Sequence, residues 1–289
     1  MSTRRAKRQG TIEPPRDVIK TTREKVVVEK MNGNTLRKKV MIITTYETIN
    51  TITIYIGNHD IYCIDVQLLK DPNTNTVNMG YLTKARWDAV CSIEEPFTNG
   101  GDTIMMIKLL VSYIKDKYPN VSGLMFNDMS TKTCDDGNSV SLASMKFLTD
   151  GKTWYESHFD ISVDSINKYS YDMMKENANI KKQELSFDNF SMYSNINYLQ
   201  VPNNELRDLY DNSATWQEFF SKIRDMIGIS KLCIWFSINN WFDIFLNIIL
   251  KINISTIKFI LNVKKYNEIK YKILNSFGGN YRITKRNRR

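Results

Sequence analysis

A pair of glycines at the start of a long apolar run could bind an anion. The segment is Asn99-Gly100-Gly101-Asp102-Thr103, and apolar residues recur after it with helical spacing until Pro119. The first N–H groups of a helix lack partners and carry the positive end of the helix dipole, and glycine allows a ligand to approach the backbone. We interpret this segment as a candidate phosphate-binding turn. The alternative is a helix start that binds nothing.

Cysteine and histidine chemistry is not supported by the spacing. Because no two cysteines form a CxxC pair and only His59 and His158 are present as imidazoles, neither a zinc site nor a disulfide framework is predicted. We expect free, buried thiols in a reducing compartment. Nothing in the spacing brings His158, Cys134 and Asp128 together for thiol catalysis. The four cysteines are Cys63, Cys91, Cys134 and Cys233.

A second glycine motif argues against nucleotide hydrolysis. Gly151-Lys152-Thr153 is similar to the end of a P-loop. That motif needs a glycine five residues before Gly151, where Lys146 stands instead.

Composition indicates a folded, basic protein. Of 289 residues, 42% are hydrophobic and 25% are charged, which allows one large domain with additions or two small domains. The formal charge of +9 permits contact with nucleic acid, anionic cofactors or acidic membranes without selecting among them.

Much of the positive charge lies in two predicted flexible tails, residues 1–22 and 278–289. They are interpreted either as solvated tails or as electrostatic arms that contact nucleic acid. The first ten residues are charged without an apolar stretch behind them, so they do not form a secretory signal. We therefore predict an intracellular protein.

The segment 23–160 predicts an α/β core. Strands are expected near residues 26–28, 40–46, 51–56, 61–69, 77–82 and 88–93, in an antiparallel meander. The long helix, a strand over 121–128 and a second helix ending at Asp150 follow. The predicted fold class is α+β or α/β, with a mixed, mainly antiparallel sheet flanked by helices.

The remainder predicts additions to that core. Residues 161–203 are polar and poorly periodic, which indicates an insertion or linker, and residues 204–277 predict a helical extension packed on the core. Within it, 232–263 is very apolar but carries a polar stripe at helical spacing. We interpret it as one helix or two successive helices on the core. An interfacial membrane helix or an oligomer contact are alternatives, and no membrane span is expected.

The order of these elements resembles the acyl-CoA-dependent N-acyltransferase (GNAT) fold. There an antiparallel sheet leads into a glycine-containing turn that binds the cofactor pyrophosphate at the start of a long helix. The later Trp154-Tyr155-Glu156-Ser157-His158-Phe159 looks like the Tyr-Glu-x-x-Gly-Phe signature of the family, one residue shorter and without the glycine. The family turn reads Arg/Gln-x-x-Gly-x-Gly/Ala, whereas this chain has Asn99, two glycines and the acidic Asp102.

The chain is also similar to a divergent GNAT-like group found in large DNA viruses, over residues 37–250. An AT-rich codon bias, visible as many Asn, Ile, Lys and Tyr residues, agrees with that origin, which would place the protein in host cytoplasm or the virion. The helical run 214–220 is compatible with the extension of that group. The matching residues are Gly101, Thr103, Asp128, Ser130, Cys134, Gly151, Lys152, Thr153, Trp154, Tyr155 and Glu156.

The resemblance implies acyl transfer from acetyl-CoA or another acyl-CoA to an amine, with the cofactor on Asn99, Gly100, Gly101, Asp102 and Thr103. Glu94 or Glu95 would be the general base and Tyr155 the general acid. A solvated carboxylate pair and a packed tyrosine are the alternatives for these roles. Because Asp102 would repel a pyrophosphate unless it caps the helix, a degenerate relative without cofactor binding stays open. The alternative function is a non-catalytic interaction or virion-associated protein whose tails contact nucleic acid.

Overall fold

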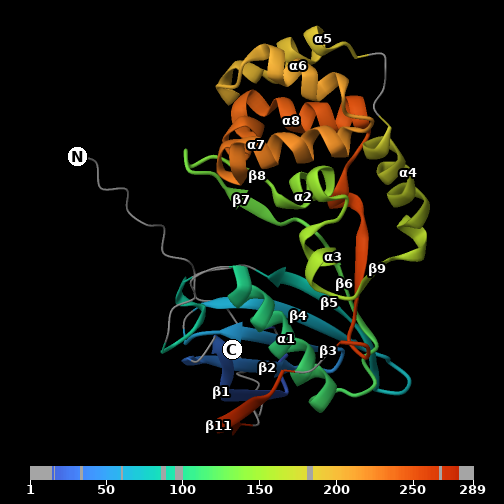
Figure 1. Ribbon diagram of the computed structural model, residues 1–289. Helices are drawn as coiled ribbons and strands as arrows, with labels where there is room; N and C mark the ends of the chain where they lie inside the picture. Colours follow the sequence, from blue (N-terminus) through green and yellow to red (C-terminus); the bar gives the residue numbers. More distant parts are fainter. Residues whose placement is uncertain are drawn as a thin grey trace, which may run out of the picture. The chain divides into compact units, whose positions relative to one another are not determined.

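The computed structural model describes residues 15, 17–32, 35–59, 61–85, 89–94, 100–180, 185–266 and 269–279. Within them the fold is mixed α+β, with a large, mostly antiparallel sheet and several helices (Figure 1), which confirms the predicted fold class at this coarser level. Contacts divide the chain into two compact units. Unit 1 contains the described residues up to Met125 and those from Asn262 onward, and unit 2 is Phe126–Leu261.

Unit 1 is built on a meander of long strands. Successive strands pair antiparallel from β1 to β5, and the last strand of the chain, β11, pairs antiparallel with the outer edge of β1. The order in this unit is β11-β1-β2-β3-β4-β5-β6. The strands are β1 (Lys20–Asn32), β2 (Thr35–Glu47), β3 (Thr51–Gly57), β4 (Tyr62–Lys70), β5 (Val77–Ala85), β6 (Gly123–Asn127, which reaches into unit 2) and β11 (Tyr271–Gly279).

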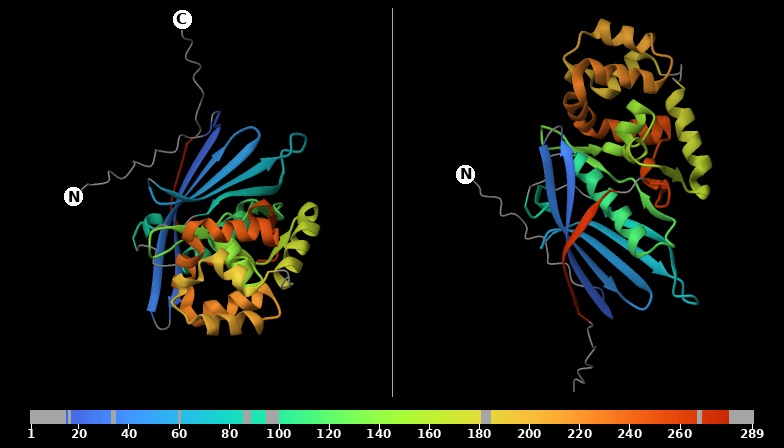
Figure 2. Two further views of the ribbon diagram at one scale, coloured as in Figure 1. Left: turned by 90° about the horizontal axis from the view of Figure 1, so that it is seen from above. Right: turned by 60° about the horizontal axis from the view of Figure 1, so that its bottom comes forward.

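Helix α1 (Gly100–Lys117) covers one face of this sheet (Figure 2). Its aliphatic side chains, Ile107, Leu110 and Ile114 among them, are buried, and Tyr113 of the helix contacts Thr45 of β2 and Glu24 of β1. The predicted amphipathic helix is therefore confirmed. It ends before Pro119, as expected for a residue that has no N–H to continue the ladder.

The segment after β5 differs from the prediction of a strand over 88–93. Its described part holds a short 3-10 helix, η1 (Ala89–Cys91), and only Ile93 donates a strand-like hydrogen bond, 2.7 Å to the carbonyl of Val40. Ser92 adds a side-chain bond to the same residue. The apolar pattern there results from packing against the end of β2 and not from a strand of its own.

Unit 2 is mostly helical. It contains β7 (Thr131–Thr133), β8 (Ser139–Ser141), α2 (Leu142–Asp150), α3 (Trp154–His158), β9 (Ile161–Val163), α4 (Lys168–Asn179), α5 (Phe187–Ser194), α6 (Asn203–Asp211), α7 (Trp216–Ser237), α8 (Trp241–Ile244), a π-helix (Phe245–Leu250) and β10 (Lys258–Asn262). Short 3-10 helices lie at Ser165–Asn167, Ile196–Leu199, Ile238–Asn240 and Ile254–Thr256. The predicted helix ending at Asp150 is confirmed as α2, with Ser141 as its N-cap and Gly151 at φ 70° as its C-cap.

Aromatic side chains fill the interior of unit 2. Phe190 of α5 is fully buried and its ring lies within 5.3–6.4 Å of rings on four other helical segments. Those rings belong to Tyr210, Phe219, Trp235, Trp241 and Phe245. This cluster explains why residues 161–203 are not a polar linker: α4 and α5 bury Tyr171, Phe187 and Phe190 among otherwise polar neighbours.

The predicted long helix over 232–263 is wrong beyond Leu250, and so is the helical extension to residue 277. Asn239, Asn240 and Lys251 adopt positive φ angles, which interrupt a right-handed helix. The polar residues at helical spacing are therefore partly turn residues. After them the chain forms strands, β10 in unit 2 and β11 in unit 1, where the sequence had suggested helix.

Candidate functional site

The predicted phosphate-binding turn lies at the start of α1, in unit 1. Gly100 is the first residue of the helix, Asp102 lies in its first turn and Thr103 is 7% exposed, while Asn99 lies outside the described residues. The acidic residue in the first turn stabilises the helix through its dipole. The same carboxylate disfavours a phosphate close to it.

The strands on either side of α1 are parallel. β5 and β6 pair through Met79 with Gly123, Gly80 with Leu124 and Tyr81 with Met125. β5 continues to Ala85, and beyond Tyr81 its described ladder partners are on β4. The chain thus passes from β5 through α1 to a parallel strand that pairs with the first half of β5 only.

Glu94, one of two predicted general bases, is exposed and forms a salt bridge of 3.3 Å with Lys25 of β1. Its side chain is 54% exposed, so the pair contributes little to stability. Glu95, the other predicted base, lies outside the described residues. The described geometry of Glu94 is that of a surface ion pair.

Tyr155, the predicted general acid, belongs to unit 2. Its side chain is 7% exposed, and its ring packs 4.6 Å from Phe126 and 5.0 Å from Trp154. Burial, with the nearby Asp128 carboxyl as a smaller cause, raises the pKa of its hydroxyl well above the ordinary value. A tyrosine in this state holds its proton more tightly than an ordinary tyrosine, so it is a weaker proton donor.

Beside Tyr155 lies a cluster of buried carboxyl and hydroxyl groups. Asp128, at the end of β6, is 1% exposed, and its Oδ1 accepts hydrogen bonds from the backbone N–H (3.1 Å) and hydroxyl (2.6 Å) of Ser130. Its Oδ2 is buried and has no partner. Burial is the main cause that raises the pKa of this carboxyl.

Glu156 completes the cluster through the start of α3. Its Oε2 accepts from the N–H of Thr153 (2.7 Å) and from the hydroxyl of Tyr171 (2.5 Å), and Thr153 caps the helix in return. Lys175 lies 3.8 Å from Oε1. Because every described contact of Glu156 is a structural bond, we interpret it as the residue that fixes α3 against α4.

The structure therefore brings part of the residues matched by resemblance together within unit 2. Asp128, Ser130, Thr153 and Glu156 meet in unit 2 around Tyr155, whereas the glycine turn and Glu94 belong to unit 1. Sequence reasoning missed Tyr171 as a partner of Glu156. The spacing of 15 residues between them gave no signal, because a strand and a 3-10 helix intervene.

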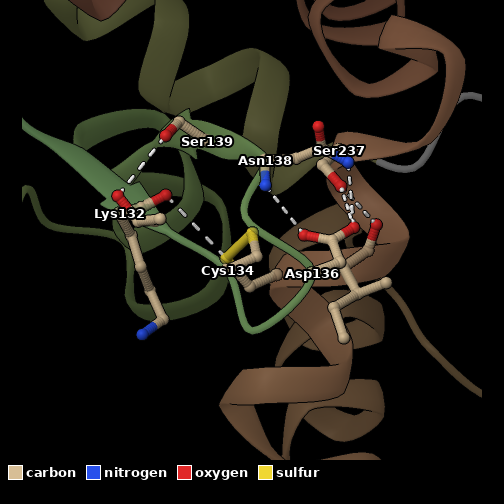
Figure 3. Close-up of a disulfide and its surroundings, with 9 residues drawn as sticks. Lys132, Cys134, Asp136, Asn138, Ser139 and Ser237 are labelled. Carbon is tan, nitrogen blue, oxygen red and sulfur yellow. Dashed lines mark hydrogen bonds between the residues drawn. A yellow bond between two sulfur atoms is a disulfide. The ribbon is translucent and has the colours of Figure 1, made fainter. Parts of the chain in front are cut away.

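The prediction of free thiols is wrong. Cys63 is bonded to Cys91 in unit 1, and Cys134 to Cys233 in unit 2 (Figure 3). Sequence separations of 28 and 99 residues conceal both pairs, because only the folded chain brings the partners together. Since Cys134 has no free thiol, it cannot serve the thiol catalysis considered with His158.

Figure 3 shows that the second disulfide joins a tight turn to α7. The Asp136 carboxylate accepts from the backbone N–H of Asn138 (3.0 Å), from its amide group (2.9 Å) and from the Ser237 hydroxyl (3.4 Å). The backbone bond from Asn138 is the largest cause that lowers the pKa of Asp136. The turn is therefore fixed by both a covalent and a hydrogen-bonded link.

One stretch among the described residues, Trp216–Leu250, is long and apolar enough to cross a membrane by length and composition alone. The core helix of a globular protein passes the same test. Here 44% of the most apolar window is buried, with Trp216 and Trp235 at most 1% exposed, and positive φ angles at Gly228, Asn239 and Asn240 interrupt the stretch.

Comparison with known proteins gave no match: no family model, curated protein or solved structure matches the chain. The resemblance to acyltransferases therefore stays a prediction.

Proposed function

We propose that the protein is a GNAT-like acyl-CoA-binding protein, an N-acyltransferase or its degenerate descendant. The observation that carries this proposal is the β5–α1–β6 unit, in which the helix between two parallel strands begins with Gly100-Gly101. An antiparallel meander that ends in such a unit is the arrangement expected from the resemblance.

The limited β5–β6 pairing adds support. The described β5–β6 ladder ends at Tyr81, whereas the β4–β5 ladder continues to Ala85, so the β6-facing edge of β5 could pair with an extended ligand at Leu82. An acyl-CoA carries amide groups in its pantetheine arm that could pair in this way, with its pyrophosphate at the N–H groups of α1.

Catalysis would require a general acid and a general base in addition to the cofactor. The raised pKa of Tyr155 makes its hydroxyl a weaker general acid, and Glu94 is held in an ion pair with Lys25. We therefore propose cofactor binding first, with acyl transfer dependent on a base that the described residues do not identify. The acceptor would be an amine.

The test is thermal unfolding in the presence of acetyl-CoA. A ligand that binds only the folded state adds about 2.7 kcal/mol at a hundredfold excess over its Kd, so the Tm should rise. Gly101→Glu should abolish the rise, because it adds a side chain and a negative charge at the turn. Asn120→Glu adds the same charge at an exposed position three residues after the last residue of α1 and should leave the rise intact.

Two results would count against the proposal. No Tm rise at millimolar acetyl-CoA would mean that the turn is structural, which would favour a non-catalytic interaction protein. A rise that Asn120→Glu and Gly101→Glu reduce equally would mean that the ligand responds to overall charge and not to the turn.

A further inference from the structure

The unit 1 sheet has a second face, opposite α1. Residues paired directly across antiparallel strands share a face, and the register pairs Arg23 with Thr44 and Thr44 with Tyr55. The neighbouring residues Glu24 and Thr45 contact Tyr113 of α1 instead. Arg23, Thr44 and Tyr55 therefore point away from the helix.

Three polar atoms on this face are buried and have no hydrogen-bond partner in the described structure: Thr21 Oγ1, Arg23 Nε and Thr44 Oγ1. Thr44 as a whole is 3% exposed. Thr21 and Arg23 are two residues apart on β1, about 7 Å along the strand, and Thr44 is the direct neighbour of Arg23 on β2. A buried donor without a partner costs about 1–3 kcal/mol, so three of them in one place indicate a missing acceptor.

The charge of Arg23 leads to the same conclusion. The part of the chain that the structure describes gives this guanidinium no carboxylate partner; Nη2 lies 3.1 Å from Nδ1 and 3.4 Å from the carbonyl oxygen of His59. Both are neutral acceptors, since a guanidinium nitrogen can only donate. Lys25, two residues along the same face, is by contrast paired with Glu94.

Tyrosines border Arg23 and Thr44 without adding negative charge. The rings of Tyr46 and Tyr55 lie 5.8 Å apart, and Tyr62 stacks on Tyr55 at 4.5 Å. Burial, with Tyr62 as the next cause, raises the pKa of Tyr46 to about 12, so its hydroxyl stays protonated at neutral pH. The nearest acid in the register is Asp65, opposite Tyr55, and Lys84 of β5 lies opposite Asp65.

We propose that Thr21, Arg23 and Thr44 form a binding site for a phosphate group. A guanidinium and two hydroxyls that stand side by side on one face of adjacent strands supply several donors that one oxyanion could accept. The phosphate would draw the guanidinium from the neutral His59 acceptors, because an anion is the stronger partner. This inference does not rest on the acyltransferase proposal, since it concerns the face that α1 does not cover.

Two sources could supply that phosphate. One is a small phosphate-bearing molecule, and the other is the phosphodiester of a single-stranded nucleic acid whose bases stack on the tyrosines. The chemistry at Arg23 is the same in both. The experiment therefore uses inorganic phosphate to define the site and a thymidine oligonucleotide to identify the source.

The test is calorimetric titration of the full chain with inorganic phosphate in the absence of acyl-CoA. Arg23→Gln should weaken binding at least about tenfold, and the nearly isosteric Thr44→Val about fivefold. Lys25→Gln is the matched control: it removes one positive charge from the same strand and face and should bind like the wild type. Arg23→Lys keeps the charge without Nε and should bind as poorly as Arg23→Gln.

The proposal is overturned if phosphate does not bind at millimolar concentration. It is also overturned if Lys25→Gln and Arg23→Gln weaken binding equally, because diffuse surface charge would then explain it. Circular dichroism verifies the fold of each variant, and Thr44→Val keeps the test valid if an arginine variant fails to fold. An oligonucleotide that displaces phosphate assigns the site to nucleic acid, and one that does not assigns it to a small phosphate compound.

Discussion

The two units of this protein are stabilised by contacts of different range. From β1 to β5, unit 1 joins strands that follow one another in the sequence, and β11 is the long-range exception that pairs with β1. Unit 2 collects aromatic rings from segments far apart in the sequence, as between Phe126 and Phe259, which are 133 residues apart. Their disulfides follow the same division, closing 28 residues in unit 1 and 99 in unit 2. Local order thus dominates in the first unit and chain closure in the second.

The largest effect is expected from removing the disulfides. In the loop-entropy relation a bridge stabilises more when it closes a longer loop, which gives about 4.7 kcal/mol for Cys134–Cys233 and about 3.6 kcal/mol for Cys63–Cys91. Paired serine variants should lose free energy of unfolding in that order. Urea unfolding with hydrogen exchange read separately in each unit measures both.

The same measurement on the wild type with a reductant is the control, and it should reproduce the two losses together. A greater loss for Cys63→Ser/Cys91→Ser than for the other pair would contradict the comparison. It would mean that closure of the long loop is not what the second bridge contributes.

A smaller effect is expected from truncating one central side chain in each unit. Phe190→Ala should destabilise unit 2 by about 4 kcal/mol, because the ring is fully buried and contacts rings on several segments. Ile54→Val removes one methyl group from the equally buried β3 and should cost about 1 kcal/mol in unit 1. Hydrogen exchange should show each loss confined to its own unit, and loss of protection in both units from either variant would refute independent cores.

The same difference in contact range between the two units decides which parts of the fold can be predicted from the sequence. Strands β2, β3 and β4 and helix α1 are readable because alternation and helical period are local signals. Residues 161–203 are not readable, since Tyr171, Phe187 and Phe190 become core residues only through partners on distant segments. The breaks at Asn239 and Asn240 depend on positive φ angles that asparagine tolerates but does not require, and the positive φ of Lys251 has no signal in its residue type.

The candidate sites, too, can be predicted from the sequence only where they depend on a local feature. The glycine turn at the start of α1 is found from sequence, because a helix start is a local feature. The Arg23–Thr44 pair is not, since it depends on the β1–β2 register, and a shift of one residue would place the two on opposite faces. Neither disulfide can be predicted from the sequence, for the same reason. The sequence shows four scattered cysteines, and only the fold selects their partners.

The smallest expected effect has opposite signs in the two units and concerns one buried carboxyl group in each. Glu24 of unit 1 accepts from the Tyr113 hydroxyl at 2.7 Å and lies 3.5 Å from Lys117, whereas Asp128 of unit 2 has one oxygen without a partner. Glu24→Gln should destabilise unit 1 by about 1 kcal/mol, because it weakens a charge-assisted hydrogen bond. Asp128→Asn should stabilise unit 2 by about 1 kcal/mol at neutral pH, because it removes a buried charge.

The pH dependence of the free energy of unfolding tests whether the buried charge of Asp128 is the cause. Burial raises the pKa of Asp128 above its ordinary 3.8, so the folded state holds its proton more tightly than the unfolded state. Its contribution to stability is complete below pH 3.8 and is lost as the pH rises through the folded-state pKa. Asp128→Asn should match the wild type in acid and exceed it at neutral pH. Four of the five tryptophans belong to unit 2, so tryptophan fluorescence during urea unfolding at several pH values reports this difference. Equal stability of wild type and variant across that range would mean that Asp128 finds a partner for its second oxygen in solution.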